Sequence, residues 1–411
     1  MNPSGYLPKL RPLDIKRVVN DGQGYLVLRD TLGLADGVVM VPEELGPLLA
    51  LCDGTRYVGE ISAAFQLSAG YPMPEARFGE LIDSLAEALV FEDERFAKAY
   101  DEAKRAYRSA AYRPPALAGR AYPEDPEELA RVFDGYCQAV GERSPNAAGP
   151  VAGVVSPHID YERGWRVYAD VWQRASSAIA ETDLVIVFGT DHSGGPGKLT
   201  LTRQSYATPW GVLPTAQPIV DALAEALGEE EAFAEEIHHR NEHSIELPLT
   251  WLHYFLRPQT CEVVPVLCGS FHQLVAGLKE PNAHEGFAKA LAVLRSASSG
   301  RRVLVVAAAD FAHVGPAFGD AQPWEISDRE ELRSTDQSLL DAISEGDHDR
   351  FFHEIRGVED RNRVCGMPPI YLALRLLAGV TGEPAGYEQC PADPENASLV
   401  SIAGAVLRRD T

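Results

Sequence analysis

The stretch "VVSPHIDY", residues 154–161, decides the fold of the larger part of the chain. Its two valines are β-branched residues of the kind that fill the interior of a sheet, and Pro157 ends the run. His158 and Asp160 follow at once. Ligands of open α/β sheets bind beyond the carboxyl ends of the strands. The stretch therefore predicts a buried strand that delivers a histidine to the functional edge of a sheet.

Similar apolar runs recur along the rest of the chain, separated by segments with helical spacing. The strand-like runs are "DLVIVFG" (183–189), "EVVPVLCG" (262–269), "RVLVVAAAD" (302–310) and "ASLVSIAGAVL" (397–407). The helix-like segments include residues 217–228, 285–297 and 337–355. Continuous apolar strands between helices are typical of a largely parallel sheet covered on both faces. We therefore expect a three-layer α/β/α domain over residues 109–411.

Residues 1–108 form a different, smaller module in this interpretation. "GYLVLRDTLGLADGVVMVP" (24–42) alternates like a pair of strands, and three short helical segments follow at residues 41–54, 55–67 and 74–90. This order predicts a small winged-helix-like α+β domain. Lys and Arg are sparse in its helices, so we expect it to dock a protein or peptide rather than DNA.

Charge and composition limit the kinds of binding partner that we expect. The chain carries 37 basic and 60 acidic residues, for a net charge of −23. This balance disfavours nucleic acid and anionic membranes, and no apolar run reaches the roughly 18 residues of a membrane span. The first residues, "MNPSGYLPKLRPLD", lack the pattern of a signal peptide. We expect a cytoplasmic protein whose six scattered cysteines form no disulfide framework.

Histidine and aspartate follow three of the predicted strands. The pairs are His158 with Asp160, Asp191 with His192, and Asp310 with His313. A single such histidine is usually a surface or core residue, but three pairs released at one sheet edge favour metal ligation or acid–base catalysis.

Two further segments are candidates for the same edge. His243 precedes the helix-like segment "IELPLTWLHYF" and is expected to donate to a substrate, whereas His238 and His239 are expected at the surface. Cys365 stands directly before a helix with prolines in its first turn, where the helix dipole stabilises a thiolate. Two imidazoles and a thiolate suit iron, copper or zinc, and sulfur biases the set toward copper(I) or zinc.

The motifs "RPPALAGRAYP", "SPHIDY", "VFGTDHSG", "YATPWG", "NEHSIELP", "AAADFAHVG" and "CGMPPI" together resemble the Memo family, in its prokaryotic form called AmmeMemoRadiSam system protein B. The resemblance runs from about Arg113 to the C-terminus. It implies the fold of the class III extradiol dioxygenases and a non-haem metal cleft. Radical-SAM and AMMECR-type proteins are implied as partners.

The resemblance also implies roles for single residues. His158 and His192 match the family's metal-site histidines, and Cys365 matches the cysteine that stands where the dioxygenases hold a carboxylate. Asp310 and His313 match a polar pair in the same cleft, with His313 as the acid–base group. His243 matches a histidine that faces the pocket. Asp160 and Asp191 depart from the family pattern and are expected to add carboxylate character to the cleft.

The first module resembles the PqqD-like peptide chaperones through "YLVLRDTLGL", "VPEELGPLL" and "LCDGTRYVGEI". That resemblance implies docking of a peptide or a radical-SAM partner by strand addition.

Three functions are consistent with these patterns. The first is a non-haem metal-dependent redox or dioxygenase-like enzyme that acts with a radical-SAM partner, with His313, Asp310 and His243 as catalytic residues. The second is a scaffold or metal carrier with a vestigial cleft. The third is a metal-free cysteine hydrolase with Cys365 as nucleophile and His313 or His192 as base.

Overall fold

The computed structural model describes residues 6–35, 37–69, 73–142 and 149–409. Residues 1–5 of the segment inspected for a signal peptide, and residue 36 of the predicted strand pair, lie outside this part. The chain divides into two compact units, Met1–Ser109 and Ala110–Thr411. This division falls one residue from the boundary expected from the sequence.

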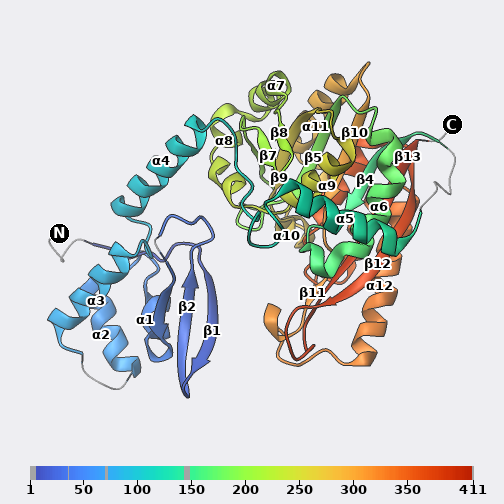
Figure 1. Cartoon of the computed structure of the whole chain (residues 1–411). Coiled ribbons are helices and arrows are strands. Elements are labelled where there is room, and N and C mark those ends of the chain that lie inside the picture. The colour runs from blue at the N-terminus through green and yellow to red at the C-terminus, as the bar shows by residue number, and fades with distance from the viewer. Residues whose placement is uncertain (1–5, 36, 70–72, 143–148, 410–411) are drawn as a thin grey trace. The chain divides into compact units, whose positions relative to one another are not determined.

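The described residues of the first unit form a three-stranded antiparallel sheet and four α-helices (Figure 1). The strands β1 and β2 are joined by Asp21 and Gly22, whose φ angles of 49° and 78° suit a two-residue hairpin turn. Neither β1 nor the last helix was predicted from the sequence. The elements are β1 (Asp14–Asn20), β2 (Gln23–Arg29), β3 (Val39–Pro42), α1 (Gly46–Leu51), α2 (Val58–Ala69), α3 (Glu75–Glu87) and α4 (Glu94–Ser109).

The second unit is built on an eight-stranded sheet with the order β11-β13-β4-β10-β5-β9-β6, in which β12 pairs with β13. Its centre is parallel, because β10 pairs in parallel with β4 and β5, and β5 pairs in parallel with β9. The strands are β4 (Val151–Ser156), β5 (Leu184–Thr190), β6 (Leu199–Leu201), β9 (Glu262–Cys268), β10 (Val303–Ala308), β11 (His313–Val314), β12 (Val380–Pro391) and β13 (Leu399–Arg409). A two-stranded ribbon, β7 (Tyr206–Thr208) with β8 (Gly211–Leu213), lies outside this sheet.

Alternate residues of the central strands pack into two separate cores. On β5, Ile186 and Phe188 join one core, and Val185 and Val187 join the other. The first core contains side chains of α7 (Gln217–Leu227), α11 (Glu285–Ser298), α12 (Ile326–Ser344), α13 (His348–Gly357) and α14 (Met367–Leu377). The second contains side chains of α5 (Pro126–Val140), α6 (Tyr161–Ile179) and α9 (Glu246–Leu256). Because both faces of the sheet are covered by helices, the predicted α/β/α class is confirmed (Figure 1).

Two details differ from the expected pattern. The last strand, β13, pairs antiparallel with both β4 and the preceding β12. The short connection between β12 and β13 allows only the antiparallel arrangement of these two strands, since a parallel pair would need a long crossover. The segment 337–355 is not one helix but the end of α12 and most of α13. The break lies at Gly346, which has a φ of +67° and where a Cβ atom would lie 2.0 Å from the carbonyl oxygen of Val380. Only glycine fits this position.

The parallel register brings the ends of β4, β5 and β10 to one edge of the sheet. The loops after these strands carry His158, His192 and Asp310. No helix in the described part of the chain is both long and apolar enough to span a membrane.

Candidate metal centre

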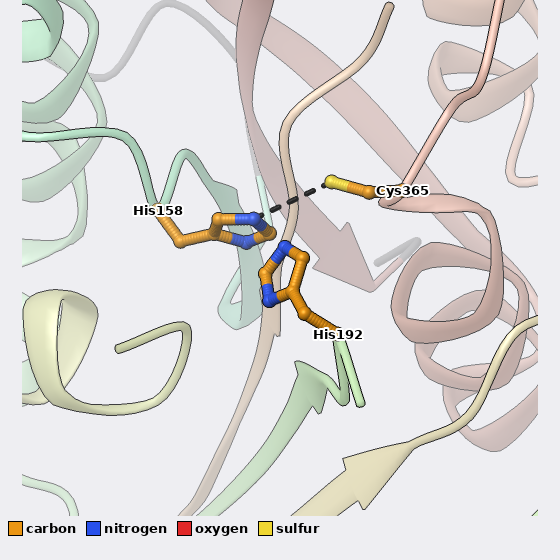
Figure 2. A group of neighbouring side chains, drawn as sticks. All are labelled: His158, His192 and Cys365. Atoms are coloured by element: carbon orange, nitrogen blue, oxygen red, sulfur yellow. Dashed lines mark hydrogen bonds between the residues drawn. The ribbon is translucent and has the colours of Figure 1, made fainter. Parts of the chain in front are cut away.

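Three side chains from distant segments meet at this edge. One ligand atom from each of His158, His192 and Cys365 lies within 4.8 Å of the other two, and Figure 2 shows them facing a common space. The Sγ atom of Cys365 is 3.4 Å from Nε2 of His158. Metal bonds of 2.0–2.3 Å in a tetrahedral set would separate two donor atoms by about 3.5 Å. The spacing of these residues therefore fits a transition-metal ion.

His158 is fixed by its neighbours in a ligand-ready orientation. Its side chain is buried, and Nδ1 lies 3.0 Å from the carbonyl oxygen of Ala308 at the end of β10. A carbonyl only accepts, so Nδ1 carries the proton and Nε2 keeps its lone pair in the neutral ring. The backbone N–H of His158 donates to Oδ1 of Asp310 at 2.8 Å. Both contacts direct Nε2 toward Cys365.

His192 is held in the same way by a carboxylate. Its Nδ1 lies 3.0 and 3.1 Å from the two carboxylate oxygens of Glu242. The rings of His192 and His158 are perpendicular, with centroids 5.2 Å apart. Carboxylate-anchored histidines are a common arrangement behind metal ions.

Cys365 reaches the site through a close approach of two loops. The carbonyl oxygen of Asp310 accepts a hydrogen bond from the backbone N–H of Gly366 at 3.0 Å. A Cβ atom at Gly366 would lie 2.5 Å from that carbonyl oxygen. The Thr190 hydroxyl donates to the carbonyl of Cys365 at 3.1 Å. The helix α14 begins two residues later, with Pro368 in its first turn as expected.

The electrostatics of the cluster favour a charged thiolate beside protonated imidazoles in the metal-free protein. Burial acts to raise the pKa of Cys365, but the neighbouring imidazoles of His158 and His313 lower it well below its ordinary value. Burial acts to lower the pKa of His158, but Asp310 and Cys365 raise it to about 9. For His192, the carboxylate of Glu242 overcomes desolvation and raises the pKa well above its usual range. A cation can therefore replace protons at this site.

The structure brings the three predicted catalytic residues to the same region. The ring of His243 stacks on that of His192, with centroids 4.9 Å apart and an interplanar angle of 12°. The buried Asp310 accepts from the backbone of His158, so it positions that loop. His313 begins β11, and its backbone N–H donates to the carbonyl of Asn362, three residues before Cys365. The catalytic roles of the three residues stay predictions.

Four other predictions have clear structural outcomes. Asp160 caps the first turn of α6 and pairs with Arg163, and Asp191 pairs with His238 at 3.0 Å. These carboxylates are thus engaged in holding the loops. The expectation of a surface position is wrong for His239, whose buried ring contacts the Tyr206 hydroxyl and the carbonyl of Thr200. His238 is also mostly covered, with 10% of its side chain exposed.

Glu242 is the residue of the site that sequence reasoning missed. It stands inside the motif "NEHSIELP", one position before His243, and its side chain is buried. The available signal was a carboxylate adjacent to a site histidine ahead of a helix, but that spacing is common at helix starts. Three-dimensional proximity to His192 has no counterpart in the local pattern.

The fold and this cluster define an α/β/α protein with two histidines and a cysteine at the strand ends. A family model described as "Memo-like protein" matches residues 113–406. The chain therefore belongs to the Memo family. A MEMO1 family protein of Aquifex aeolicus is 27% identical over 97% of this chain and 99% of its own length. A MEMO1 family protein of Archaeoglobus fulgidus is 26% identical over 72% of this chain and 99% of its own length.

Proposed function

We propose that this protein binds a transition-metal ion through His158, His192 and Cys365 and uses it in a redox or dioxygenase-like reaction. One observation carries the proposal. The Nδ1 atoms of the two histidines are engaged by the carbonyl of Ala308 and the carboxylate of Glu242, so both Nε2 atoms face Cys365, where an ion can displace their protons. Iron, copper and zinc all accept this donor set, and the sulfur favours the softer ions.

The surrounding residues support proton transfer next to the ion. When bound, such an ion would supply Lewis-acid or one-electron chemistry at its open positions. His243 lies against His192 with 39% of its side chain exposed, so a substrate can reach it from solvent. His313 is partly exposed and interacts electrostatically with Cys365. We assign His243 and His313 to proton transfer with a phenolic substrate.

The direct test is anaerobic loading with iron(II), followed by measurement of O₂ uptake with catechol-type substrates. Uptake that needs both the metal and the substrate, and that is lost in His313→Ala, supports the proposal. No uptake with iron or copper would leave the second candidate ahead.

The second candidate is a metal carrier or scaffold, and Cys365 is the observation that favours it. A thiolate in place of a carboxylate removes the hard third ligand that oxygen-activating iron sites commonly use. Such a protein would hold zinc or copper(I) without turnover. The metal-free cysteine hydrolase requires Cys365 to react with iodoacetamide at a rate that added metal does not change.

We also propose that the first unit docks a peptide or a radical-SAM partner, and that an AMMECR-type protein acts with the same system. The strand β1 is an edge strand, and six of its seven residues are exposed. Edge strands present unpaired backbone groups to which a further strand can add. A Val19→Pro variant, which removes an N–H that points away from β2, should weaken partner binding in a pull-down without changing the metal content.

A further inference from the structure

Glu242 contacts two histidines of the site rather than one. Its Oε2 atom lies 3.0 Å from Nδ1 of His192, and its Oε1 atom lies 3.1 Å from Nδ1 of His243. We infer that Glu242 is a shared positioning residue that fixes both rings with the proton on Nδ1 and the lone pair on Nε2. This inference deepens the proposed metal function and rests on it.

The carboxylate is itself held in place. Backbone N–H groups of His192, His243 and Ser244 donate to it at 3.2, 2.8 and 3.0 Å. The side chain is 7% exposed. An ionised carboxylate accepts hydrogen bonds but donates none. The neutral ring of His192, whose Nδ1 makes a hydrogen bond with Glu242, must therefore carry its proton there, and the ion-pair contact of His243 favours the same tautomer.

The stacking of His192 on His243 determines where the Nε2 atoms of both rings lie. The two rings are almost parallel and are held at the same carboxylate, so their Nε2 edges lie side by side, away from Glu242. His192 offers its lone pair to the ion. His243 is outside the group of ligand atoms formed with Cys365, but its ring centroid is 5.5 Å from that of His158. Its Nε2 is placed to accept a proton from a substrate that binds beside the ion, rather than to donate one as the sequence suggested.

A purely structural reading is that Glu242 joins two loops through their backbone N–H groups. Glu242→Gln separates the two readings. The amide oxygen at the Oε1 position still accepts from the backbone N–H groups of His243 and Ser244, while the NH₂ group at the Oε2 position can accept neither from Nδ1 nor from the N–H of His192. Loss of an outer carboxylate commonly weakens metal binding by about 10–100-fold. Glu235→Gln is the matched control, since Glu235 holds the same loop through the N–H of Gly195 at 3.0 Å but contacts neither histidine in the described part of the chain.

Zinc affinity is measured by chelator competition, together with ¹⁵N spectra of labelled histidine across a pH titration that reaches the neutral rings. We expect Glu242→Gln to bind zinc about 10–100-fold more weakly and to lose the Nδ1–H form of His192, whose Nδ1 then faces the NH₂ group. Glu242→Asp should recover part of the affinity, and Glu235→Gln should match the wild type. Unchanged tautomers in Glu242→Gln would overturn the inference. If the wild type binds no metal, the proposed function fails, but the tautomers of the metal-free protein still test Glu242.

Discussion

The Sγ atom of Cys365 lies 3.4 Å from Nε2 of His158, although 207 positions separate the two residues. Asp310 joins their loops. Its carboxylate accepts from the backbone N–H of His158, and its carbonyl accepts from the N–H of Gly366. The buried Asp310, which lies in the loop after β10, thus sets the distance between His158 and Cys365.

This contact predicts a spectroscopic signature for Cys365. Cobalt(II) added to the wild type should give a thiolate-to-metal charge-transfer band in the near ultraviolet. Cys365→Ser should lose the band, because a hydroxyl is a harder and weaker ligand than a thiolate. The matched control is Cys137→Ser, since Cys137 is a free cysteine on α5. A band that persists in Cys365→Ser would place the sulfur outside the metal site.

The close approach at Gly366 predicts an effect of a single methyl group. In Gly366→Ala, the new Cβ would lie 2.5 Å from the carbonyl of Asp310 and 2.6 Å from the Cβ of Ala309. The loop must move, and Cys365 moves with it. We expect zinc affinity to fall by at least about tenfold, as for loss of a supporting contact. Isothermal titration gives the affinity.

Gly135 in α5 supplies the comparison, because a Cβ atom there meets nothing within 4 Å. Gly135→Ala should keep the zinc affinity and raise the melting temperature slightly, since alanine is the better helix former. Equal zinc affinities in the two variants would show that the approach of the loops does not position Cys365.

Metal uptake should release protons. The pKa of His158 is raised to about 9 by Asp310 and Cys365, so this ring holds a proton at pH 7 that a metal ion must displace. The pKa of His192 is also raised, by Glu242. Binding of zinc at pH 7 should therefore release at least about one proton, and the affinity should rise with pH. A pH indicator in weak buffer measures the release, and zinc uptake without proton release would contradict the assigned ligands.

Asp336 predicts a pH dependence of stability away from the metal site. It is fully buried on α12 beside the Tyr387 hydroxyl, and burial raises its pKa from 3.8 to about 6. The folded protein thus holds this proton more tightly than the unfolded chain. The stabilisation is complete below pH 3.8 and is lost as the pH rises through 6.

The neutral variant Asp336→Asn cannot titrate. Between pH 4 and pH 6.5, the free energy of unfolding of the wild type should fall relative to that of Asp336→Asn by on the order of 2 kcal/mol. Urea unfolding at the two pH values measures the difference. Parallel pH profiles of the two proteins would show that burial does not hold this proton.

The sequence predicts the layers of the second unit because strand and helix have different periods, as the two faces of β5 illustrate. It predicts the meeting of His158 and His192 because parallel strands end at one edge. It does not predict Glu242, because a hydrogen bond to Nδ1 across 50 positions leaves no local pattern. His239 was wrongly predicted at the surface, because the sequence does not show that its ring is buried in contact with the Tyr206 hydroxyl.

The order of the strands in the sheet could also not be predicted from the sequence. Periodicity identifies β13 as a strand, but its antiparallel place beside β4 depends on pairing with β12. The edge strand β1 was missed because almost all of its residues are exposed, so it shows no apolar alternation.

The central claim is that one ion is held by ligands from three segments of the chain. Elemental analysis of protein purified without chelator, for the wild type and for the double variant His158→Ala with His192→Ala, tests it most directly. The account predicts about one equivalent of iron, copper or zinc in the wild type and almost none in a folded double variant. Full metal occupancy in the double variant would contradict it.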